Sequence, residues 1–347
     1  MKTHVEISSD SDGKLLIVDY LKGFSIFTIA LMHLLYLMTS MPAKIITLSS
    51  IGGSGVHVFF ICSGIGLYTS YLKKKTSYGE FLKKRFLKIY LPYIFIIFIC
   101  FFIPWVYDAG NRAMSLLSHV FLFKMFIPAY EISFGEHFWF ISTIFQLYAL
   151  FIPMCRLKQK LSNNKLFAFI FCGISVAWWI LCDILDIGSI RIWGSFCLQY
   201  IWEFALGFIL AEAFFNHKKI KLNNYLLFAL SVLGIGLQAL MVLYFDNLKA
   251  FNDVPALIGY SSLALLLSNI SIVKNICNKL SAFSYEYYLV HMLVFGIVFR
   301  TFKPTGLFLQ CVVGCIAMII ALAVAYMYNK IIRLLNSRHK QSKTALN

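Results

Sequence analysis

Long runs of apolar residues, separated by short polar segments, dominate this chain of 347 residues. A helix needs about 20 mostly apolar residues to cross the hydrocarbon core of a bilayer. Ten stretches fit this requirement, and they predict an all-α, polytopic bundle of membrane-spanning helices. Their approximate bounds are 15–38, 54–72, 89–107, 137–155, 166–182, 193–212, 225–245, 255–273, 281–300 and 306–330.

A shorter apolar segment, from Leu116 to Ile127, lies in the loop 108–136 and is interrupted by His119 and Lys124. We interpret it as a lid or an interfacial helix. The alternative is an eleventh, distorted span. The basic residues favour the first interpretation, because a further span here would move the later basic loops to the opposite side of the membrane.

Basic residues are concentrated in alternate loops of the chain. If the N-terminus is cytoplasmic, twenty-three Lys and Arg residues lie on the cytoplasmic side and seven on the other, while Lys22 lies inside the first span. Cytoplasmic loops of membrane proteins are enriched in these residues. The bias therefore predicts ten spans with both ends cytoplasmic.

The composition argues against several classes of protein. The apolar set makes up 60% of the chain and only 13% is charged, against about 25% in a typical soluble domain. These figures argue against a soluble enzyme and exclude a disordered or collagen-like chain. The formal net charge of +16 reflects the basic loops of a membrane protein, so we expect no nucleic-acid partner.

We expect one membrane domain, residues 15–333, between a cytoplasmic tail at 1–14 and a basic cytoplasmic tail at 334–347. The acidic first tail lacks the basic region of a signal peptide. Nine cysteines lie in or near the spans without a CxxC pair, which is typical of free thiols in an apolar core. Without a metal or nucleotide motif, we expect neither a metal nor a permanently bound cofactor. The abundance of Lys, Ile, Asn and Phe is typical of an AT-rich bacterial genome, and we expect a bacterial cytoplasmic membrane.

The first predicted span carries three polar side chains on one face. At 100° per residue, Asp19, Lys22 and His33 fall within a stripe about 60° wide, and His33 lies about 16 Å further along the helix than Lys22. Ionisable groups inside a bilayer are costly, so each is a candidate functional residue. The stripe is typical of a water-accessible path. Two structural explanations stay open: an ion pair between Asp19 and Lys22, and a hydrogen-bonded core histidine at His33.

Further candidates lie in and after the second predicted span. Small residues between Gly52 and Gly66 either allow helices to pack closely or let the backbone near Ser63 approach a ligand. Arg85 and Lys88 share a helix face. They either set topology and contact lipid headgroups or form a cytosolic cradle for a phosphorylated ligand.

Polar and aromatic side chains also mark three later spans. Trp139 begins the fourth span, where it belongs either to an interfacial aromatic belt or to a pocket. Glu203 lies within the sixth span. In the ninth span Tyr288 and His291 share one face, whereas Glu286 points elsewhere. We predict that Trp139, Glu203, Tyr288 and His291 line a pocket or bind a ligand in it.

Five segments carry a family resemblance: Asp19 to His33, Gly55 to Gly64, Phe81 to Tyr93, His137 to Phe140 and Ser284 to His291. In this order, and with ten spans, they resemble the membrane-bound acyltransferase 3 family over residues 15–330. The first segment has Asp-Tyr-Leu-Lys-Gly where the family has Asp-x-x-Arg-Gly. His33 follows Lys22 by eleven residues, which is the spacing between the arginine and the histidine in the family. The second is similar to Gly-Val-x-x-Phe-Phe-x-x-Ser-Gly, the fourth to His-x-Trp-Phe and the fifth to Ser-Tyr-x-x-Tyr-Leu-x-His.

Some positions depart from the family pattern. Lys22 and Lys88 stand where arginine is common, and a lysine presents a point charge rather than a bidentate fork. Ile144 and Phe145 occupy the positions of a glutamate pair that some members carry. We expect no second catalytic domain after the last span.

The resemblance implies an enzyme that moves an acyl group, most often acetyl, from cytosolic acyl-CoA to a hydroxyl of a cell-surface polysaccharide or lipid-linked sugar. We predict that His33 is the general base that takes the hydroxyl proton, with Asp19 and Lys22 as further catalytic residues. A transient acyl-histidine is the alternative. The expected donor-binding residues are Lys22, Ser63, Arg85 and Lys88. The expected residues of the acceptor or its pocket are Trp139, Glu203, Tyr288 and His291. The expected partners are the lipid bilayer, acetyl-CoA and a glycan acceptor.

Two rival functions remain. Ten spans with charges inside the membrane are also typical of an exporter of a glycan or lipid intermediate. A membrane sensor or scaffold with the same fold and no catalysis is the other rival, and the lysine at position 22 favours it.

Overall fold

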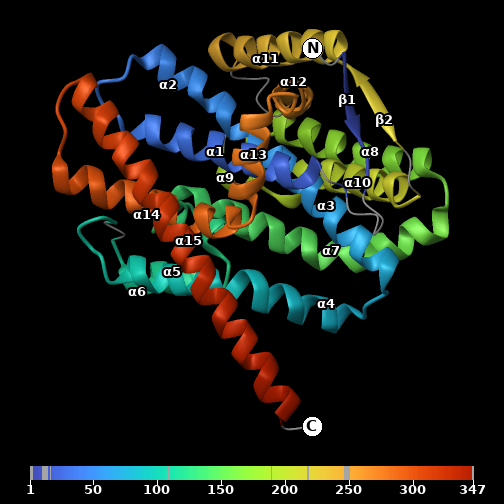
Figure 1. Ribbon diagram of the computed structural model, residues 1–347, viewed down its shortest axis with the longest axis horizontal. Helices are drawn as coiled ribbons and strands as arrows, with labels where there is room; N and C mark the ends of the chain where they lie inside the picture. The colour runs from blue at the N-terminus through green and yellow to red at the C-terminus, as the bar shows by residue number, and fades with distance from the viewer. Residues whose placement is uncertain are drawn as a thin grey trace.

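Helices form almost the whole of the structure (Figure 1). The computed structural model describes residues 3–9, 15, 17–107, 110–188, 190–216, 219–245 and 251–345. The longer helices are α1 (Ile17–Leu37), α3 (Gly55–Lys73), α5 (Leu91–Phe101), α7 (Trp139–Leu161), α8 (Asn164–Ile184), α10 (Cys197–Phe215), α11 (Asn224–Tyr244), α12 (Asp253–Leu267), α13 (Ser271–Ser281), α14 (Ser284–Phe302) and α15 (Leu307–Ala345).

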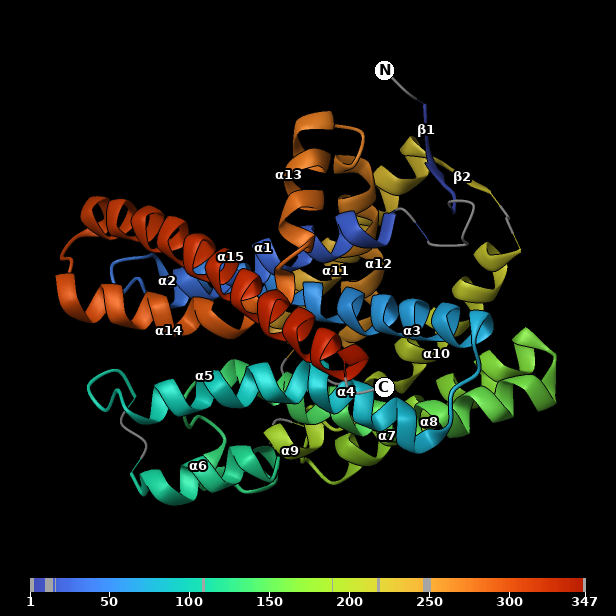
Figure 2. The same cartoon turned by 60° about the horizontal axis from the view of Figure 1, so that its bottom comes forward.

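Shorter elements connect these helices. They are the strands β1 (His4–Ile7) and β2 (Ile220–Asn223), the helices α2 (Ala43–Ser49), α4 (Tyr78–Arg85), α6 (Arg112–Val120) and α9 (Arg191–Gly194), the π-helical turn η2 (Phe86–Tyr90), and the 3-10 turns η1 (Ser50–Ser54), η3 (Lys124–Phe126), η4 (Pro128–Tyr130) and η5 (Glu136–Phe138). The α14–α15 connection and α6 lie at one end of the bundle, at the left of both views, and the α3–α4 and α7–α8 connections lie at the other (Figures 1 and 2).

The helices confirm an all-α membrane protein with several spans. Among the described residues, seven helices are long and apolar enough to cross a bilayer, or eight if the bent pair α12 and α13 counts as one span. The count of ten and the side of each end stay predictions. The predicted third span corresponds to α5, whose 11 residues are few for a crossing. The predicted ninth corresponds to α14, which begins with polar residues and ends near Arg300.

The predicted span 255–273 is wrong in its bounds. Helix α12 ends at Leu267, and α13 begins at Ser271 after a bend of 114°. The residues at the break explain it, because Ser and Asn side chains compete with the helical hydrogen bonds of the backbone. The Ser268 hydroxyl donates to the carbonyl oxygen of Leu265 at 2.6 Å, and the Asn269 amide donates to Asn224 Oδ1 at 3.3 Å.

A two-stranded antiparallel sheet, which the sequence pattern did not predict, joins the N-terminal segment to the α10–α11 connection. His4 pairs with Asn223 and Ile7 with Ile220. The predicted tail 1–14 is therefore partly structured, while its residues 1–2 and 10–14 lie outside the described residues. The pairing holds the start of the chain beside the start of α11, where the N–H of Asn224 bonds to the carbonyl oxygen of Thr3 (Figure 1).

The described part of the loop 108–136 contains a short helix and two 3-10 turns, η3 and η4, as expected for a lid or interfacial segment, and η5 begins at its last residue. Helix α6 has nine residues, too few to cross a bilayer. His119 is fully buried and links the Tyr93 hydroxyl, 2.7 Å from Nδ1, to the carbonyl oxygen of Ser133, 2.9 Å from Nε2. Lys124 is buried as well and donates to the carbonyl oxygens of Ser133 and Gly135. Burial lowers the pKa of Lys124 to about 7.

Glycines allow close contact between α3 and α10. A Cβ added to Gly64 would lie 2.3 Å from the carbonyl oxygen of Phe204, and one added to Gly207 would lie 2.6 Å from that of Ile61. Small residues at such crossings let helix backbones approach closely inside a membrane. Close packing is therefore the role of Gly64, whereas its neighbour Ser63 lines a cavity.

The buried residues form two apolar clusters. One contains residues of α3, α7, α8 and α10, the other contains residues of α5, α14 and α15, and α1 contributes to both. Three helices on the outside are largely exposed. In the most apolar 18-residue stretch of α8, α11 and α15, only 28%, 22% and 28% of the stretch is buried inside the protein. These exposed apolar faces suit contact with lipid tails.

Candidate active site

A cavity of about 880 Å³ lies where the two clusters meet, with Cys62 and Tyr148 of one and Ile141 and Tyr288 of the other in its walls. It follows α1 from Asp19 to Tyr36, a helical rise of about 25 Å. This length is close to the thickness of a bilayer's hydrocarbon core, about 30 Å.

Eight of the ten predicted site residues line this cavity. They are Asp19, Lys22, His33, Ser63, Arg85, Lys88, Trp139 and Tyr288. The three residues of the polar stripe on the first helix thus lie in the wall of one cavity. The other two predicted residues, His291 and Glu203, are not in the cavity wall.

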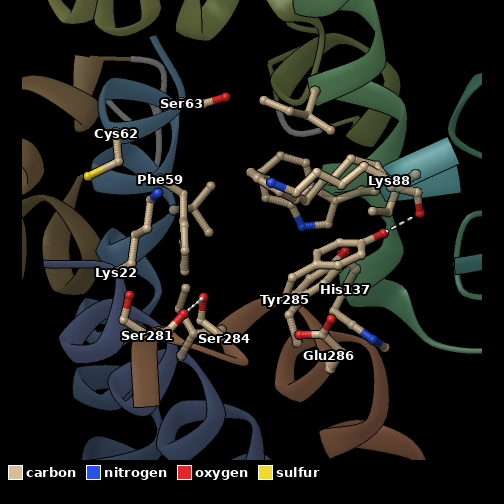
Figure 3. Close-up of a pocket in the computed structure, with 18 of the residues that line it drawn as sticks. Lys22, Phe59, Cys62, Ser63, Lys88, His137, Ser281, Ser284, Tyr285 and Glu286 are labelled. Atoms are coloured by element: carbon tan, nitrogen blue, oxygen red, sulfur yellow. Dashed lines mark hydrogen bonds between the residues drawn. The ribbon is translucent and has the colours of Figure 1, made fainter. Parts of the chain in front are cut away.

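Basic residues predominate in the half of the cavity nearer the start of α1. We call this part the basic end, and it is lined by Lys22, Arg85, Lys88 and Arg333, together with the acidic residues Asp19 and Glu286. Figure 3 shows Lys22 and Ser63 on one side of the space and Lys88 and Glu286 on the other. The Nε of Arg85 is buried and makes no hydrogen bond within the described part of the chain. Such an arrangement suits a ligand with several negative charges.

The chain geometry around Arg85 and Lys88 has a local cause. Ser77 caps α4 by accepting from the backbone N–H of Glu80, and the Arg85 guanidinium lies 5.7 Å from the ring of Phe81. The helix then widens into η2, in which the N–H of Leu91 bonds to the carbonyl oxygen of Phe86. Pro92 follows and has no N–H to donate, which interrupts the ordinary α-helical ladder.

Two histidines form a hydrogen-bonded pair beside the middle of the cavity. Nδ1 of His33 lies 2.9 Å from Nε2 of His291. Nδ1 of His291 lies 3.0 Å and 2.8 Å from the carbonyl oxygens of Tyr287 and Tyr288. Carbonyl oxygens only accept, so Nδ1 of His291 carries a proton and its Nε2 is an acceptor when the ring is neutral.

This chain of bonds fixes the tautomer of His33. Its Nδ1 must donate to His291, which leaves Nε2 of His33 with a free lone pair. His33 lines the cavity, whereas His291 is fully buried behind it. The alternative, a hydrogen-bonded core histidine, therefore explains Nδ1 of His33 but not its Nε2.

His137 is a cavity residue that the sequence analysis did not select. Both of its ring nitrogens are buried without a hydrogen-bond partner in the described part of the chain, and its ring centre lies 6.0 Å from that of His33. Gly135 makes room for this ring, since a Cβ there would lie 2.7 Å from Cε1 of His137 and the φ angle is +121°. The His-x-Trp-Phe motif was the available signal for this residue.

The opposite part of the cavity, which we call the far end, is lined by Tyr36, Glu136 and Arg191. The Arg191 guanidinium lies 5.7 Å from the centre of the Trp139 ring. Trp139 in turn stacks on Tyr200, with ring centres 5.9 Å apart. The contacts of Trp139 are those of a pocket wall rather than of an aromatic belt.

The prediction that Glu203 lines this cavity is wrong. Glu203 is fully buried and its Oε1 lies 2.7 Å from Nδ1 of His57, because it sits on the face of α10 that packs against α3. Nε2 of His57 lies 3.7 Å from Oδ1 of Asp253. The ligand atoms of these three residues lie within 4.8 Å of one another, so this set has the composition of a metal site. However, each ring nitrogen of His57 already faces a carboxylate oxygen, one at hydrogen-bond distance and the other at ion-pair distance.

The prediction that Glu286 points away from the site is also wrong. Ser284, Tyr285, Glu286 and Tyr288 all line the cavity (Figure 3). The first turn of α14 meets the cavity end-on, so consecutive residues reach it instead of a single helix face. Angular spacing along a helix does not predict such an arrangement.

Comparison with known proteins agrees with this geometry. A family model described as an acyltransferase domain matches residues 15–329. Neither curated proteins nor solved structures give a match. The matched region contains the whole cavity wall apart from its two last residues, and the chain belongs to the acyltransferase 3 family of membrane acyltransferases.

Proposed function

We propose that this membrane acyltransferase moves an acetyl group from acetyl-CoA on the cytosolic side to a hydroxyl of a cell-surface polysaccharide, a lipid-linked sugar or a similar glycan. The observation that carries the proposal is the free Nε2 of His33, held in the cavity wall by the His33–His291 hydrogen bond. A general base needs a lone pair within reach of the reacting hydroxyl.

The basic end supports acetyl-CoA as the donor. CoA carries several phosphate charges, and Arg85, Lys88 and Arg333 supply positive charge at that end. Ser63 and Tyr148 also line the cavity, and their hydroxyl groups can donate hydrogen bonds to a bound donor. The pantetheine arm of the donor then extends along the cavity toward His33.

In the proposed transfer, His33 is the only residue that takes up and releases a proton. The acceptor O–H proton moves to Nε2 of His33 while the hydroxyl oxygen attacks the thioester carbonyl carbon. The new ester C–O bond forms, the C–S bond breaks, and the CoA thiolate takes the proton back from the His33 imidazolium. His291 stays hydrogen-bonded to Nδ1 and holds the ring in place.

A label on the acetyl group tests the proposal. Membranes that contain the wild-type chain are incubated with acetyl-labelled acetyl-CoA, and label is measured in the glycan fraction. His33→Ala is expected to lower the rate by about a hundredfold to ten-thousandfold, the usual contribution of a general base. His4→Ala replaces an exposed histidine in β1 and serves as the matched control.

Two results would contradict the proposal. Retained transfer in a folded His33→Ala variant would remove His33 from the mechanism. Glycan that crosses the membrane without gaining label in wild type would instead identify an exporter.

A further inference from the structure

A second, smaller cavity lies next to the far end of the first. Its volume is about 280 Å³, and its polar lining includes Glu131, Arg191, Gln199, Tyr200 and Asp253. Arg191 lines both cavities. Arg191 therefore lies between the two spaces, on the side of the active site opposite the basic end.

The wall of the second cavity is held by a buried polar network. Gln199 and Asp253 are only 4% and 9% exposed, and the Gln199 amide donates to Asp253 Oδ2 at 2.6 Å. His57 faces Asp253 Oδ1 from behind and is itself bonded to Glu203. Buried ionisable groups are costly in a membrane protein, and the proposed chemistry at His33 does not use this network. Its effect is to present the Asp253 carboxylate to the cavity in a fixed orientation.

Aromatic rings connect this cavity to the active site. Tyr200 lines the second cavity and stacks on Trp139, which lines the first. Trp139 follows His137 by two residues, and the His137 ring lies beside that of His33. These ring contacts link the wall of the second cavity to the wall of the active site.

The chemistry of the lining selects among ligands. Carboxylates accept hydrogen bonds from hydroxyl groups, while the guanidinium and the amide group donate them. The two carboxylates of Glu131 and Asp253 repel a polyanion such as CoA. The cavity volume is near the lower limit for small-molecule sites, so the cavity suits a single sugar ring better than an oligosaccharide.

We infer that the second cavity is the acceptor subsite and binds one neutral pyranose ring, with Asp253 and Gln199 contacting its hydroxyls and Arg191 at the junction with the active site. This inference rests on the proposed function, because it names the place and the charge class of the acceptor.

Direct binding of simple sugars tests the inference without any acyl transfer. Full-length protein in lipid nanodiscs is examined by saturation-transfer NMR with methyl β-D-glucopyranoside, methyl β-D-galactopyranoside and methyl N-acetyl-β-D-glucosaminide. At least one is expected to gain signal from wild type. Gln199→Leu and Asp253→Asn are expected to weaken that binding about tenfold, the effect of losing one hydrogen bond to a charged or fixed partner.

Matched controls separate a binding site from a general loss of structure. Gln238→Leu removes another buried amide, which donates to Ser54 Oγ and lines neither cavity, and is expected to bind sugar like wild type. Arg191→Gln alters a half-buried side chain and tests the site even if Asp253→Asn does not fold. Methyl β-D-glucuronide, with its carboxylate, is expected to bind more weakly than the neutral glucoside.

Three outcomes would overturn the inference: no saturation transfer to any of the three neutral sugars, equal weakening by Gln199→Leu and Gln238→Leu, or preference for the glucuronide. Failure of the proposed function gives a different result. In that case wild type binds the neutral sugar normally, yet no label moves to it from acetyl-CoA.

Discussion

A single hydrogen bond between two imidazoles decides which nitrogen of His33 faces the reaction space. His291 is locked by two backbone carbonyls of its own helix, so it presents an acceptor to Nδ1 of His33. If His291 positions His33, a replacement side chain that accepts a hydrogen bond from Nδ1 of His33 must preserve part of the activity. If His291 only fills space, any side chain of similar volume must do so.

Two substitutions at position 291 distinguish these roles. His291→Leu keeps an apolar filling but offers no acceptor, and we expect kcat to fall about tenfold to a hundredfold with little change in KM for acetyl-CoA. His291→Gln offers an amide oxygen to Nδ1 of His33, and we expect it to recover much of that loss. Steady-state kinetics of acetyl transfer measure both. Equal activity of the two variants would show that the hydrogen bond has no catalytic role.

The sequence was informative about residues on one helix and less so about residues from several. The angular positions of Asp19, Lys22 and His33 predicted their common cavity wall. The same reasoning did not predict that His57, Glu203 and Asp253 would meet, because three separate helices bring them together. Glu203 was therefore selected as a costly intramembrane charge, but its location was wrong.

At the scale of helices, the crossing of α3 and α10 depends on the absence of side chains. Gly64 and Gly66 lie on the same helix in different surroundings. A Cβ on Gly64 would meet backbone atoms of α10 at 2.3 Å, whereas a Cβ on Gly66 would have no neighbour within 4 Å. We expect Gly64→Ala to lower stability by about 1–3 kcal/mol through overpacking. Gly66→Ala should be neutral or slightly stabilising, since alanine favours a helix.

Thermal unfolding in nanodiscs, followed by the loss of monodisperse protein, measures both glycine variants. Each replaces a glycine of α3 by alanine, so helix propensity changes equally. A similar midpoint for the two variants would contradict close packing at Gly64.

Most helices followed from hydropathy because the bilayer imposes a long apolar run on each span. The exceptions have local causes. Ser268 and Asn269 end α12 early, and the pairing of β1 with β2 joins segments more than 200 residues apart. Neither a side chain–backbone hydrogen bond nor a distant strand partner leaves a periodic signal in the sequence.

At the scale of the whole molecule, the two ends of the main cavity differ in charge. The basic end is lined by four cations, while the far end meets a smaller space that contains two carboxylates. His33 lies between them on α1. Under the proposed function, this difference in charge predicts that donor and acceptor approach His33 from opposite sides, so that neither must cross the hydrocarbon.

Membrane vesicles of known orientation test this arrangement. Inside-out vesicles are loaded with a neutral methyl glycoside, and acetyl-labelled acetyl-CoA, which does not cross lipid, is added outside. We expect label on the trapped sugar, because the excess of Lys and Arg in the loops near the basic end predicts that this end faces the cytoplasm. Right-side-out vesicles treated in the same way should give only the background of His33→Ala vesicles until they are permeabilised. Equal labelling in intact vesicles of both orientations would contradict a two-sided path, and labelling in right-side-out vesicles alone would reverse the predicted topology.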